Sequence, residues 1–468
     1  MTGSTESPRR RPLPRTDRAR ILLVMGLALA VTVFTATVPL LRDWFDLRVY
    51  HGAIDTWIHG DGRLYDYRVP GTTYGFTYPP FAAVAMLPMA LVGLRTAIVL
   101  CLVLNLAALA AVLYVLAGPR IRRYGWYATA LVLCALALFE PVRDTFSFGQ
   151  VNLLLLALVL SDAWLLSTGR GRWAGVGIGL AAAIKLTPAI FIGLLLIARR
   201  WRAAGLATAV AASATAAAAW IAPGASRFYW TEALWDTSRI GRLDYVSNQS
   251  LQGVLARFVA PHEPSRAVWA LLVAVVLGVC AWRVRTAVRA SDWIAAFAVT
   301  GLTACLVSPI TWVHHLVWLL PSFAVLLRHR RLLPLTAALY AVLCSSVVWL
   351  WFDGASGIDG FVGSNAYVWI TLGLLLGLPI GQPGSGLPFL SRRDRATTAA
   401  PNPAAPAITP ASDQPGPVAA AFSRFSRTGG DSRSAWGAAA GRRGRSEPTG
   451  STRPAARKPQ SSSDRASS

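Results

Sequence analysis

The chain of 468 residues is 54% hydrophobic and only 14% charged, and its mean hydropathy is +0.46. These values exclude an ordinary soluble globular protein and predict an all-α polytopic membrane protein. The formal net charge of +23 is mostly arginine, and much of it lies near the two ends of the chain. Basic segments beside membrane helices orient those helices, so this charge does not indicate a nucleic-acid partner.

The composition divides the chain into three parts. Residues 1–19 form a basic arm, residues 20–381 a membrane domain, and residues 382–468 a tail rich in Pro, Ala, Ser, Gly and Arg. The tail lacks hydrophobic periodicity, so we expect it to be disordered. The first apolar run, residues 21–41, has about the length of a full span and no small-residue cleavage site after it, so we do not expect a cleaved signal peptide.

Apolar runs along the membrane domain predict about 10–12 transmembrane helices. Arginine clusters between the runs are expected to face the cytoplasm, which places both termini there and the polar loops on the outer face of the cell membrane. The runs cover residues 21–41, 79–93, 96–117, 126–139, 150–167, 174–198, 204–222, 267–282, 292–308, 310–327, 332–352 and 366–380. The outer loops cover residues 42–78, 140–149, 223–264 and 353–365.

Two of the runs admit two topologies. In the favoured one, 79–93 does not cross fully, and 174–198 crosses twice as two half-helices broken near Lys185. In the alternative, each run crosses once. That alternative leaves the arginine cluster at 120–123 and Arg170 on the outer face, against the positive-inside rule.

The first outer loop carries Asp46, which begins the sequence DLRVY a few residues beyond the first run. A carboxylate at the membrane rim suits a general base, because partial desolvation raises its pKa toward neutrality. The alternative is a structural role for Asp46, as a helix N-cap or in an ion pair with Arg42 or Arg48.

The second outer loop brings polar side chains to the mouth of a span, among them Glu140, Arg143, Gln150 and Asn152. Amides and carboxylates bind sugar hydroxyls, because they offer directional donors and acceptors. Helix capping is the alternative, and for Asp144 it is the favoured one.

Lys185 is one of only two lysines in the chain, and it lies inside an apolar run. A cation within a membrane segment costs about 2.5–3.5 kcal/mol on insertion scales, so it normally faces a cavity, a partner or an anionic ligand. Pro188 removes a helix hydrogen bond and disfavours helix at Thr187, so the helix is expected to break beside the lysine. This pattern predicts a phosphate site. The alternative is that Lys185 snorkels or pairs with a carboxylate.

Further polar residues follow in the third outer loop and near the start of the run 310–327. Asn248 and Gln249 lie in the sequence SNQSLQG, which we interpret as a ligand-facing turn. The adjacent His314 and His315 would point about 100° apart on a helix, so both cannot face one metal ion squarely. No His-x3-His or Cys spacing supplies further zinc ligands, so one histidine facing a polar cavity is favoured over metal binding.

Six short motifs follow one another along the chain: DLRVY at 46–50, YPP at 78–80, GQVN at 149–152, AIKLTP at 183–188, NQSL at 248–251 and WVHH at 312–315. Together they resemble glycosyltransferase family 87, and the resemblance covers roughly residues 20–380. It implies a multispanning enzyme of the glycosyltransferase-C fold, with a catalytic first extracytoplasmic loop and polyprenyl-phosphomannose as donor. In actinobacteria, members of this family extend phosphatidylinositol mannosides and lipoglycans.

The resemblance also implies roles for single residues. Asp46 would be the general base of an inverting displacement that forms an α-mannosidic, 1→2 linkage, and Lys185 or Arg143 would compensate the charge of the donor phosphate. The implied partners are membrane lipids, the lipid-linked donor and a glycolipid acceptor; no cofactor and no protein partner is implied, and metal assistance stays open. Residues expected to bind sugar or acceptor are Tyr50, Glu140, Gln150, Asn152, Asn248, Gln249, His314 and His315.

Two other functions compete with this interpretation. A transferase of another polyprenyl-phosphate-linked sugar, such as arabinofuranose or glucose, would keep the same architecture, because fold alone does not set the sugar. A transporter of lipid-linked sugars would also carry broken helices and intramembrane charge. It should show repeated halves, and the sequence has no corresponding pair of interrupted segments.

Overall fold

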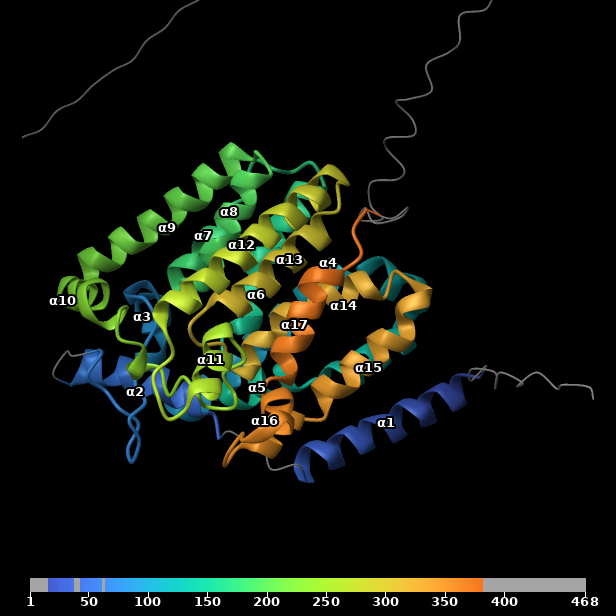
Figure 1. The fold of residues 1–468 in the computed structure, drawn as a ribbon, viewed down its shortest axis with the longest axis horizontal. Coiled ribbons are helices and arrows are strands. Elements are labelled where there is room, and N and C mark those ends of the chain that lie inside the picture. Colours follow the sequence, from blue (N-terminus) through green and yellow to red (C-terminus); the bar gives the residue numbers. More distant parts are fainter. Residues whose placement is uncertain (1–15, 38–42, 61–63, 382–468) are drawn as a thin grey trace, which may run out of the picture. The chain divides into compact units, whose positions relative to one another are not determined.

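The computed structural model describes residues 16–37, 43–60 and 64–381, which are helical apart from turns and one antiparallel bridge between Arg68 and Gly75 (Figure 1). The predicted tail and most of the predicted basic arm lie outside these residues. The α-helices are α1 (Asp17–Thr37), α2 (Phe45–His59), α3 (Pro80–Met86), α4 (Leu94–Leu138), α5 (Glu140–Phe148), α6 (Asn152–Ser167), α7 (Val176–Ile184), α8 (Ile190–Ile197), α9 (Trp201–Ile221), α10 (Pro223–Phe228), α11 (Leu251–Val259), α12 (Arg266–Arg289), α13 (Trp293–Val307), α14 (Leu320–Leu326), α15 (Leu333–Cys344), α16 (Gly357–Ser364) and α17 (Ala366–Gly377). Short 3-10 or π segments are η1 (Leu87–Leu91), η2 (Thr187–Ala189), η3 (Tyr229–Ala233), η4 (Thr237–Arg239), η5 (Val313–Leu319), η6 (Arg330–Leu332) and η7 (Val347–Trp351).

Four of the described helices, α1, α4, α9 and α12, are long and apolar enough to cross a membrane. Two bent pairs qualify as broken spans, α5 with α6 at 119° and α16 with α17 at 58°. The predicted all-α polytopic membrane protein is therefore confirmed. Other predicted runs form apolar helices of 10–17 residues, shorter than the roughly 20 that cross a bilayer. The number of 10–12 spans thus stays a prediction.

Helix α4 joins two runs that the sequence separates, 96–117 and 126–139. The helix has 45 residues and a kink at Gly125, where φ is 70° and ψ is −160°. This backbone conformation is open to glycine because it has no Cβ. The arginine cluster at 120–123 continues the first half of the helix up to the kink, so it is not a loop.

The predicted break beside Lys185 is confirmed. Helix α7 ends at this lysine, whose extended backbone has φ −147° and ψ 131°, and η2 and α8 follow. Glycines let α7 approach its neighbours closely: a Cβ on Gly177 would lie 2.1 Å from the Leu158 carbonyl oxygen, and one on Gly179 2.6 Å from that of Ala207. Small residues of this kind allow tight helix packing in membranes. The packing fixes where α7 ends and therefore where Lys185 lies.

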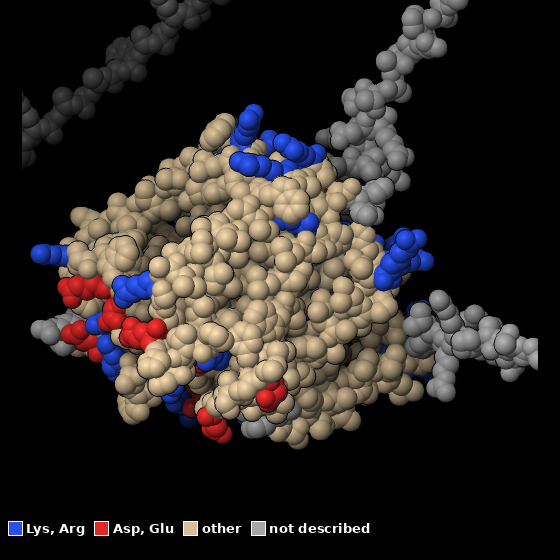
Figure 2. All heavy atoms as spheres, in the orientation of Figure 1, with Lys and Arg blue, Asp and Glu red and all other residues tan. Residues whose placement is uncertain are grey.

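The predicted outer loops are largely helical. The first contains α2, whose buried face packs against the aromatic side chains of residues 65–78. On the face drawn in Figure 2, acidic side chains gather where α2 and α16 lie, whereas the end at which α8 meets α9 shows basic side chains without acidic ones. The charged groups are therefore sorted toward two ends with an apolar surface between them, as expected for a chain that crosses a membrane.

Candidate active site

A cavity of about 520 Å³ opens between α2, the segment before α3, η2, the loop around η4 and the segment 304–315. Its volume lies in the range of small-molecule sites. Apolar residues of the membrane helices and polar or aromatic residues of the predicted outer loops both contribute to its wall. The residues of the wall that the sequence singled out are Asp46, Tyr50, Gln150, Lys185, His314 and His315.

Asp46 lies in the first turn of α2, with its side chain at the cavity. The side-chain amide of Gln150 donates a hydrogen bond of 2.5 Å to the carboxylate. Burial raises the pKa of Asp46 to about 6, and the hydrogen bond from Gln150 and the charge of Lys185 partly oppose this shift. A carboxylate with such a pKa is mostly ionised at neutral pH and still basic enough to accept a proton from a reacting group.

Two of the three structural alternatives for Asp46, the N-cap and the ion pair with Arg48, are wrong. The N-cap position of α2 is Trp44, and Arg48 makes its ion pair with Asp43, at 2.7 Å. Arg42 lies outside the described residues. The carboxylate of Asp46 therefore accepts a hydrogen bond from an amide, and it neither caps α2 nor pairs with Arg48.

A tight turn between α5 and α6 delivers Gln150 to Asp46. The turn residue Gly149 has φ 71°, and a Cβ there would lie 2.7 Å from Cβ of Leu47 on α2. Only glycine fits this contact and this backbone conformation without strain. The backbone N–H of Trp44 donates to the Ser147 carbonyl at 3.0 Å, which fastens the start of α2 to α5.

Two tyrosines orient the amide of Gln150. Tyr50 donates to the Tyr78 hydroxyl at 2.9 Å, and Tyr78 donates to the side-chain oxygen of Gln150 at 2.9 Å. Because the amide oxygen accepts from Tyr78, its NH₂ group is turned toward Asp46. Tyr78 is not among the predicted site residues, although it lies in the YPP motif at 78–80.

Lys185 lies at the other end of the same network. Its Nζ is 3.3 Å from the Tyr78 hydroxyl, 3.3 Å from Oδ1 of Asn152 and 2.7 Å from Nε2 of His315. The backbone N–H of Trp312 donates to Nδ1 of His315 at 3.1 Å and fixes which ring nitrogen faces the lysine. Lys185 has no carboxylate within ion-pair distance among the described residues, so the predicted alternative of a direct ion pair is wrong.

A family model for glycosyltransferase family 87 matches residues 76–309. A polyprenol-phosphate-mannose-dependent alpha-(1-2)-phosphatidylinositol mannoside mannosyltransferase of Mycolicibacterium smegmatis is 32% identical over 372 residues, which are 74% of this chain and 84% of the relative. The chain belongs to glycosyltransferase family 87. It is therefore a hexosyltransferase, as the six motifs predicted, and the transporter alternative is wrong.

Two further relatives of this family 87 glycosyltransferase have related names. A polyprenol-phosphate-mannose-dependent alpha-(1-2)-phosphatidylinositol pentamannoside mannosyltransferase of Mycolicibacterium smegmatis is 36% identical, over 66% of this chain and 75% of the relative. A phosphatidylinositol mannoside mannosyltransferase of Mycobacterium tuberculosis, with the same donor and linkage in its name, is 35% identical, over 60% of this chain and 69% of the relative. No solved structure matches the chain.

The other predicted site residues of the glycosyltransferase lie behind the cavity wall. Asn152 does not line the cavity but contacts two residues that do. Its side-chain oxygen accepts from Lys185, and its side-chain nitrogen donates to the Gln150 oxygen at 3.3 Å. Arg143 donates to the Ser346 hydroxyl at 2.8 Å, and its guanidinium lies 5.3 Å from the ring centroid of Phe34. The carboxylate of Glu140 accepts hydrogen bonds from the side chains of Trp349 and Tyr367.

Asn248 and Gln249 are fully buried and bind backbone groups. Asn248 donates to the carbonyls of Leu243 and Pro309 and accepts from the Thr311 N–H. Gln249 donates to two carbonyls, each at 2.7 Å, one in its own loop and one at the end of α16, and it accepts from the first turn of α17. These two amides thus join three segments of the chain, and neither lines the cavity.

The histidine pair does not form part of a metal cluster. In the described part of the chain, no group of three or more His, Cys, Asp or Glu side chains lies close enough to hold a metal ion. His314 packs edge-on against Phe148, with ring centroids 5.1 Å apart, and its carbonyl accepts from Thr145 at 3.3 Å. His315 contacts Lys185, so the two histidines serve different neighbours.

Proposed function

We propose that this glycosyltransferase moves mannose from polyprenyl-phosphomannose to a phosphatidylinositol mannoside or lipoglycan acceptor. The observation that carries the proposal is a cavity in which the carboxylate of Asp46 and the amine of Lys185 are linked through Gln150 and Tyr78. A base for the acceptor hydroxyl and a cation for the leaving phosphate are what this reaction requires. The donor and acceptor named in the relatives support mannose and phosphatidylinositol mannosides.

In this mechanism Asp46 accepts the proton of an acceptor hydroxyl as the hydroxyl oxygen attacks C1 of the donor mannose. The bond between C1 and the phosphate oxygen breaks, and its electron pair leaves with the lipid phosphate. Attack on the face opposite the phosphate turns a β-linked donor into an α-linked product, and the relatives' names support a 1→2 linkage. A phosphate monoester is a weak base, so the leaving group needs no general acid.

We assign the donor phosphate to Lys185 and not to Arg143, because only Lys185 reaches the cavity. Asn152 and His315 contact the amine and would position it. Gln150 would hold the carboxylate of Asp46 in the ionised form, since its amide donates to that group. Tyr50 supports Gln150 through Tyr78.

The apolar part of the cavity wall suits the lipid chain of the donor. Leu186 and Ile190, near η2 and α8, and Ala304 and Val307 on α13 supply this surface. A polyprenyl chain is poorly solvated by water and gains free energy by leaving it. The donor would therefore lie with its lipid toward these helices and its phosphate toward Lys185.

We further propose that the cavity opens on the extracytoplasmic face of the cell membrane and that both termini are cytoplasmic. Basic side chains without acidic ones at the end where α8 meets α9 support a cytoplasmic position for that end (Figure 2). The residues that build the polar wall, including Asp46 on α2, belong to the other end (Figure 1). Residues 20–381 would then form the catalytic domain, between a basic arm and a tail.

Purified protein in liposomes, supplied with radiolabelled polyprenyl-phosphomannose and a phosphatidylinositol mannoside, tests the proposal. We expect wild type to form an α-linked mannoside and Asp46→Asn to be slower by roughly 10²–10⁴-fold, the usual contribution of a general base. The matched control is Asp43→Asn, because Asp43 is 72% exposed and paired with Arg48; its rate should stay within about twofold of wild type. A β-linked product, or full activity of folded Asp46→Asn, would contradict the mechanism.

A further inference from the structure

The wall of the cavity contains a second cation, Arg239, to which the proposed function assigns no role. It is the last residue of η4 in the segment between α10 and α11, and its side chain is 23% exposed. The wall differs in composition from one part to the next: α8 and α13 supply apolar residues, whereas the segment around Arg239 supplies Thr237, Tyr245 and Ser247 beside the apolar Leu234 and Ile240. An acceptor that extends from Asp46 must use the part that the donor lipid leaves free.

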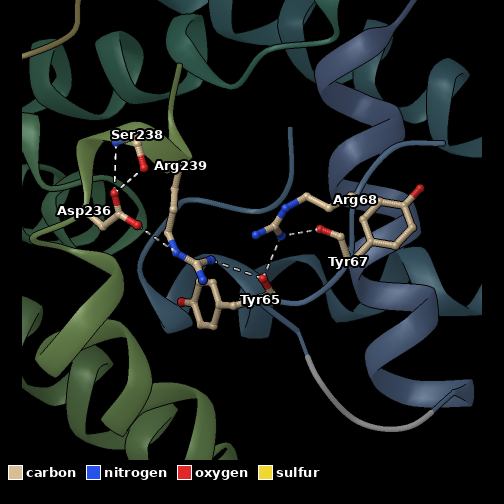
Figure 3. A network of polar contacts seen from close by, with 6 residues as sticks. All are labelled: Tyr65, Tyr67, Arg68, Asp236, Ser238 and Arg239. Carbon is tan, nitrogen blue, oxygen red and sulfur yellow. Dashed lines mark hydrogen bonds and ion pairs between the residues drawn. The ribbon is translucent and has the colours of Figure 1, made fainter. Parts of the chain in front are cut away.

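Two of the three guanidinium nitrogens of Arg239 contact protein oxygens, as Figure 3 shows. Its Nε lies 3.5 Å from the carboxylate of Asp236, and Nη1 donates to the Tyr65 carbonyl at 3.4 Å. The group also stacks over the ring of Phe228, 4.9 Å from its centroid. Among the described residues Nη2 has no hydrogen-bond partner, so its two N–H groups are available to a ligand.

Arg68 approaches the same carbonyl from the first outer loop. Its Nη1 donates to the oxygens of Tyr65 and Tyr67, each at 2.8 Å, and so fastens the turn that returns at Gly75 (Figure 3). The Tyr65 carbonyl therefore joins the loop of α2 to the segment of η4. This joint fixes the position of Arg239 relative to the element that carries Asp46.

Aromatic rings lie beside Arg239 in the wall. A Cβ on Gly241 would lie 3.0 Å from the ring of Trp312 and 3.4 Å from that of Tyr74, so the backbone at this glycine runs between the two rings. Tyr245 packs edge-on against Trp312, with centroids 5.8 Å apart. All three rings line the cavity.

A guanidinium beside aromatic rings matches a hexose. The C–H face of a pyranose packs on an aromatic face, whose electron density is negative, and its hydroxyl rim accepts N–H hydrogen bonds. A phosphate fits this place less well, because Asp236 already compensates part of the charge of Arg239, whereas no carboxylate of the described residues lies within ion-pair distance of Lys185. The ligand chemistry favoured here is thus a neutral sugar.

We infer that Arg239 and Trp312 form the subsite for an acceptor sugar, with Trp312 as the stacking surface and Arg239 as the hydroxyl donor. The inference rests on the proposed function, since it assumes an acceptor whose hydroxyl meets Asp46. It makes Arg239 a determinant of acceptor affinity without a part in the chemistry at C1. Donor binding at Lys185 is independent of it.

Steady-state transfer by Arg239→Gln, with acceptor and donor varied separately, tests this inference. We expect the acceptor KM to rise about tenfold, as for the loss of one or two hydrogen bonds from a charged donor, with donor KM and the slow hydrolysis of donor without acceptor unchanged. The matched control is Arg242→Gln, on the same segment, where the arginine is 79% exposed and paired with Asp244; its acceptor KM should equal that of wild type. Trp312→Ala should raise the acceptor KM as well.

An unchanged acceptor KM in folded Arg239→Gln would overturn the inference, and so would a rise in donor KM alone, which would move Arg239 to the donor phosphate. If Arg239→Gln unfolds, Arg239→Lys provides the same test, because lysine keeps the charge and loses the planar set of donors. Failure of wild type to transfer mannose is a separate result that counts against the proposed function.

Discussion

Two sets of buried polar residues look alike in the sequence and differ in the structure. The cavity network consists of Asp46, Tyr78, Gln150 and Lys185, which bond to one another and line the cavity. The bracket set consists of Glu140, Arg143, Asn248 and Gln249, which do not line the cavity and whose side chains bond to backbone groups or to neighbouring side chains. Both sets are rich in amides and charges, so residue type alone does not separate them.

The two sets differ in the hydrogen-bond partners of their side chains and in whether a ligand could replace those partners. Gln249 uses both amide hydrogens and its oxygen on the backbone of three segments. The amine of Lys185 contacts the side chains of Tyr78 and His315 in the cavity wall and that of Asn152 just behind it, and a phosphate oxygen can replace these contacts. A buried polar group whose partners are all backbone holds the fold together, whereas one that borders a cavity with exchangeable partners is placed for a ligand.

The largest effect is expected from Lys185→Met, which removes the proposed phosphate contact and keeps the length of the side chain. We expect kcat/KM for the donor to fall roughly 10²–10³-fold, as for the loss of one preorganised charge-stabilising group. The acceptor KM should change little. Arg143→Met is the matched control from the bracket set, and a loss of donor use in that variant alone would exchange the roles of the two cations.

The pH dependence of transfer tests whether Asp46 is the general base. A general base works in its ionised form, so the rate should rise with pH and level off above the pKa, which burial raises to about 6. At pH 5 we expect kcat/KM to be about tenfold below its plateau. Assays between pH 4.5 and 8 locate this limb, and a midpoint near 4 would mean that the base is an exposed carboxylate.

Gln150→Leu should shift the rising part of this pH profile. The amide of Gln150 stabilises the ionised carboxylate, so its removal raises the pKa of Asp46 further and shifts the midpoint to higher pH. Transfer would then be several-fold slower near pH 6.5 and recover at pH 8. Gln252→Leu on α11 is the control, since this buried amide is not in the cavity wall. An unshifted limb in Gln150→Leu would show that the amide does not act on the base.

The smallest effect on transfer is expected from Gln249→Leu. Leucine leaves the carbonyls of Val246 and Ser364 buried without this donor, whereas the Val368 N–H keeps its bond to the Asn365 carbonyl. The free energy of unfolding should therefore fall by about 2 kcal/mol or more. The rate per folded molecule should stay within about twofold of wild type. Thermal unfolding in detergent gives the first quantity and transfer normalised to folded protein the second; a stable but inactive variant would place Gln249 in the site.

The sequence predicted the parts of the fold that depend on local patterns. Lys185 and Pro188 predicted the broken helix, because a buried cation and a missing backbone N–H both disfavour a continuous membrane helix at the place where they occur. The continuous helix α4 was not predicted, because the arginines at 120–123 separate two apolar runs in the sequence, whereas the helix continues through them to the kink at Gly125. The same limit applies to the site: motif order identified Asp46 and Gln150, but only the tertiary structure separates Gln150 from Gln249.

We propose that the cavity network performs the chemistry and that the bracket set maintains the fold. The most direct test compares Asp46→Asn with Gln249→Leu in one liposome assay, as transfer per folded molecule, with thermal unfolding measured on the same samples. We predict that Asp46→Asn unfolds at or above the wild-type temperature and transfers roughly 10²–10⁴-fold more slowly, whereas Gln249→Leu unfolds earlier and transfers at nearly the wild-type rate. Equal loss of transfer in the two folded variants would contradict this division of roles between the cavity network and the bracket set.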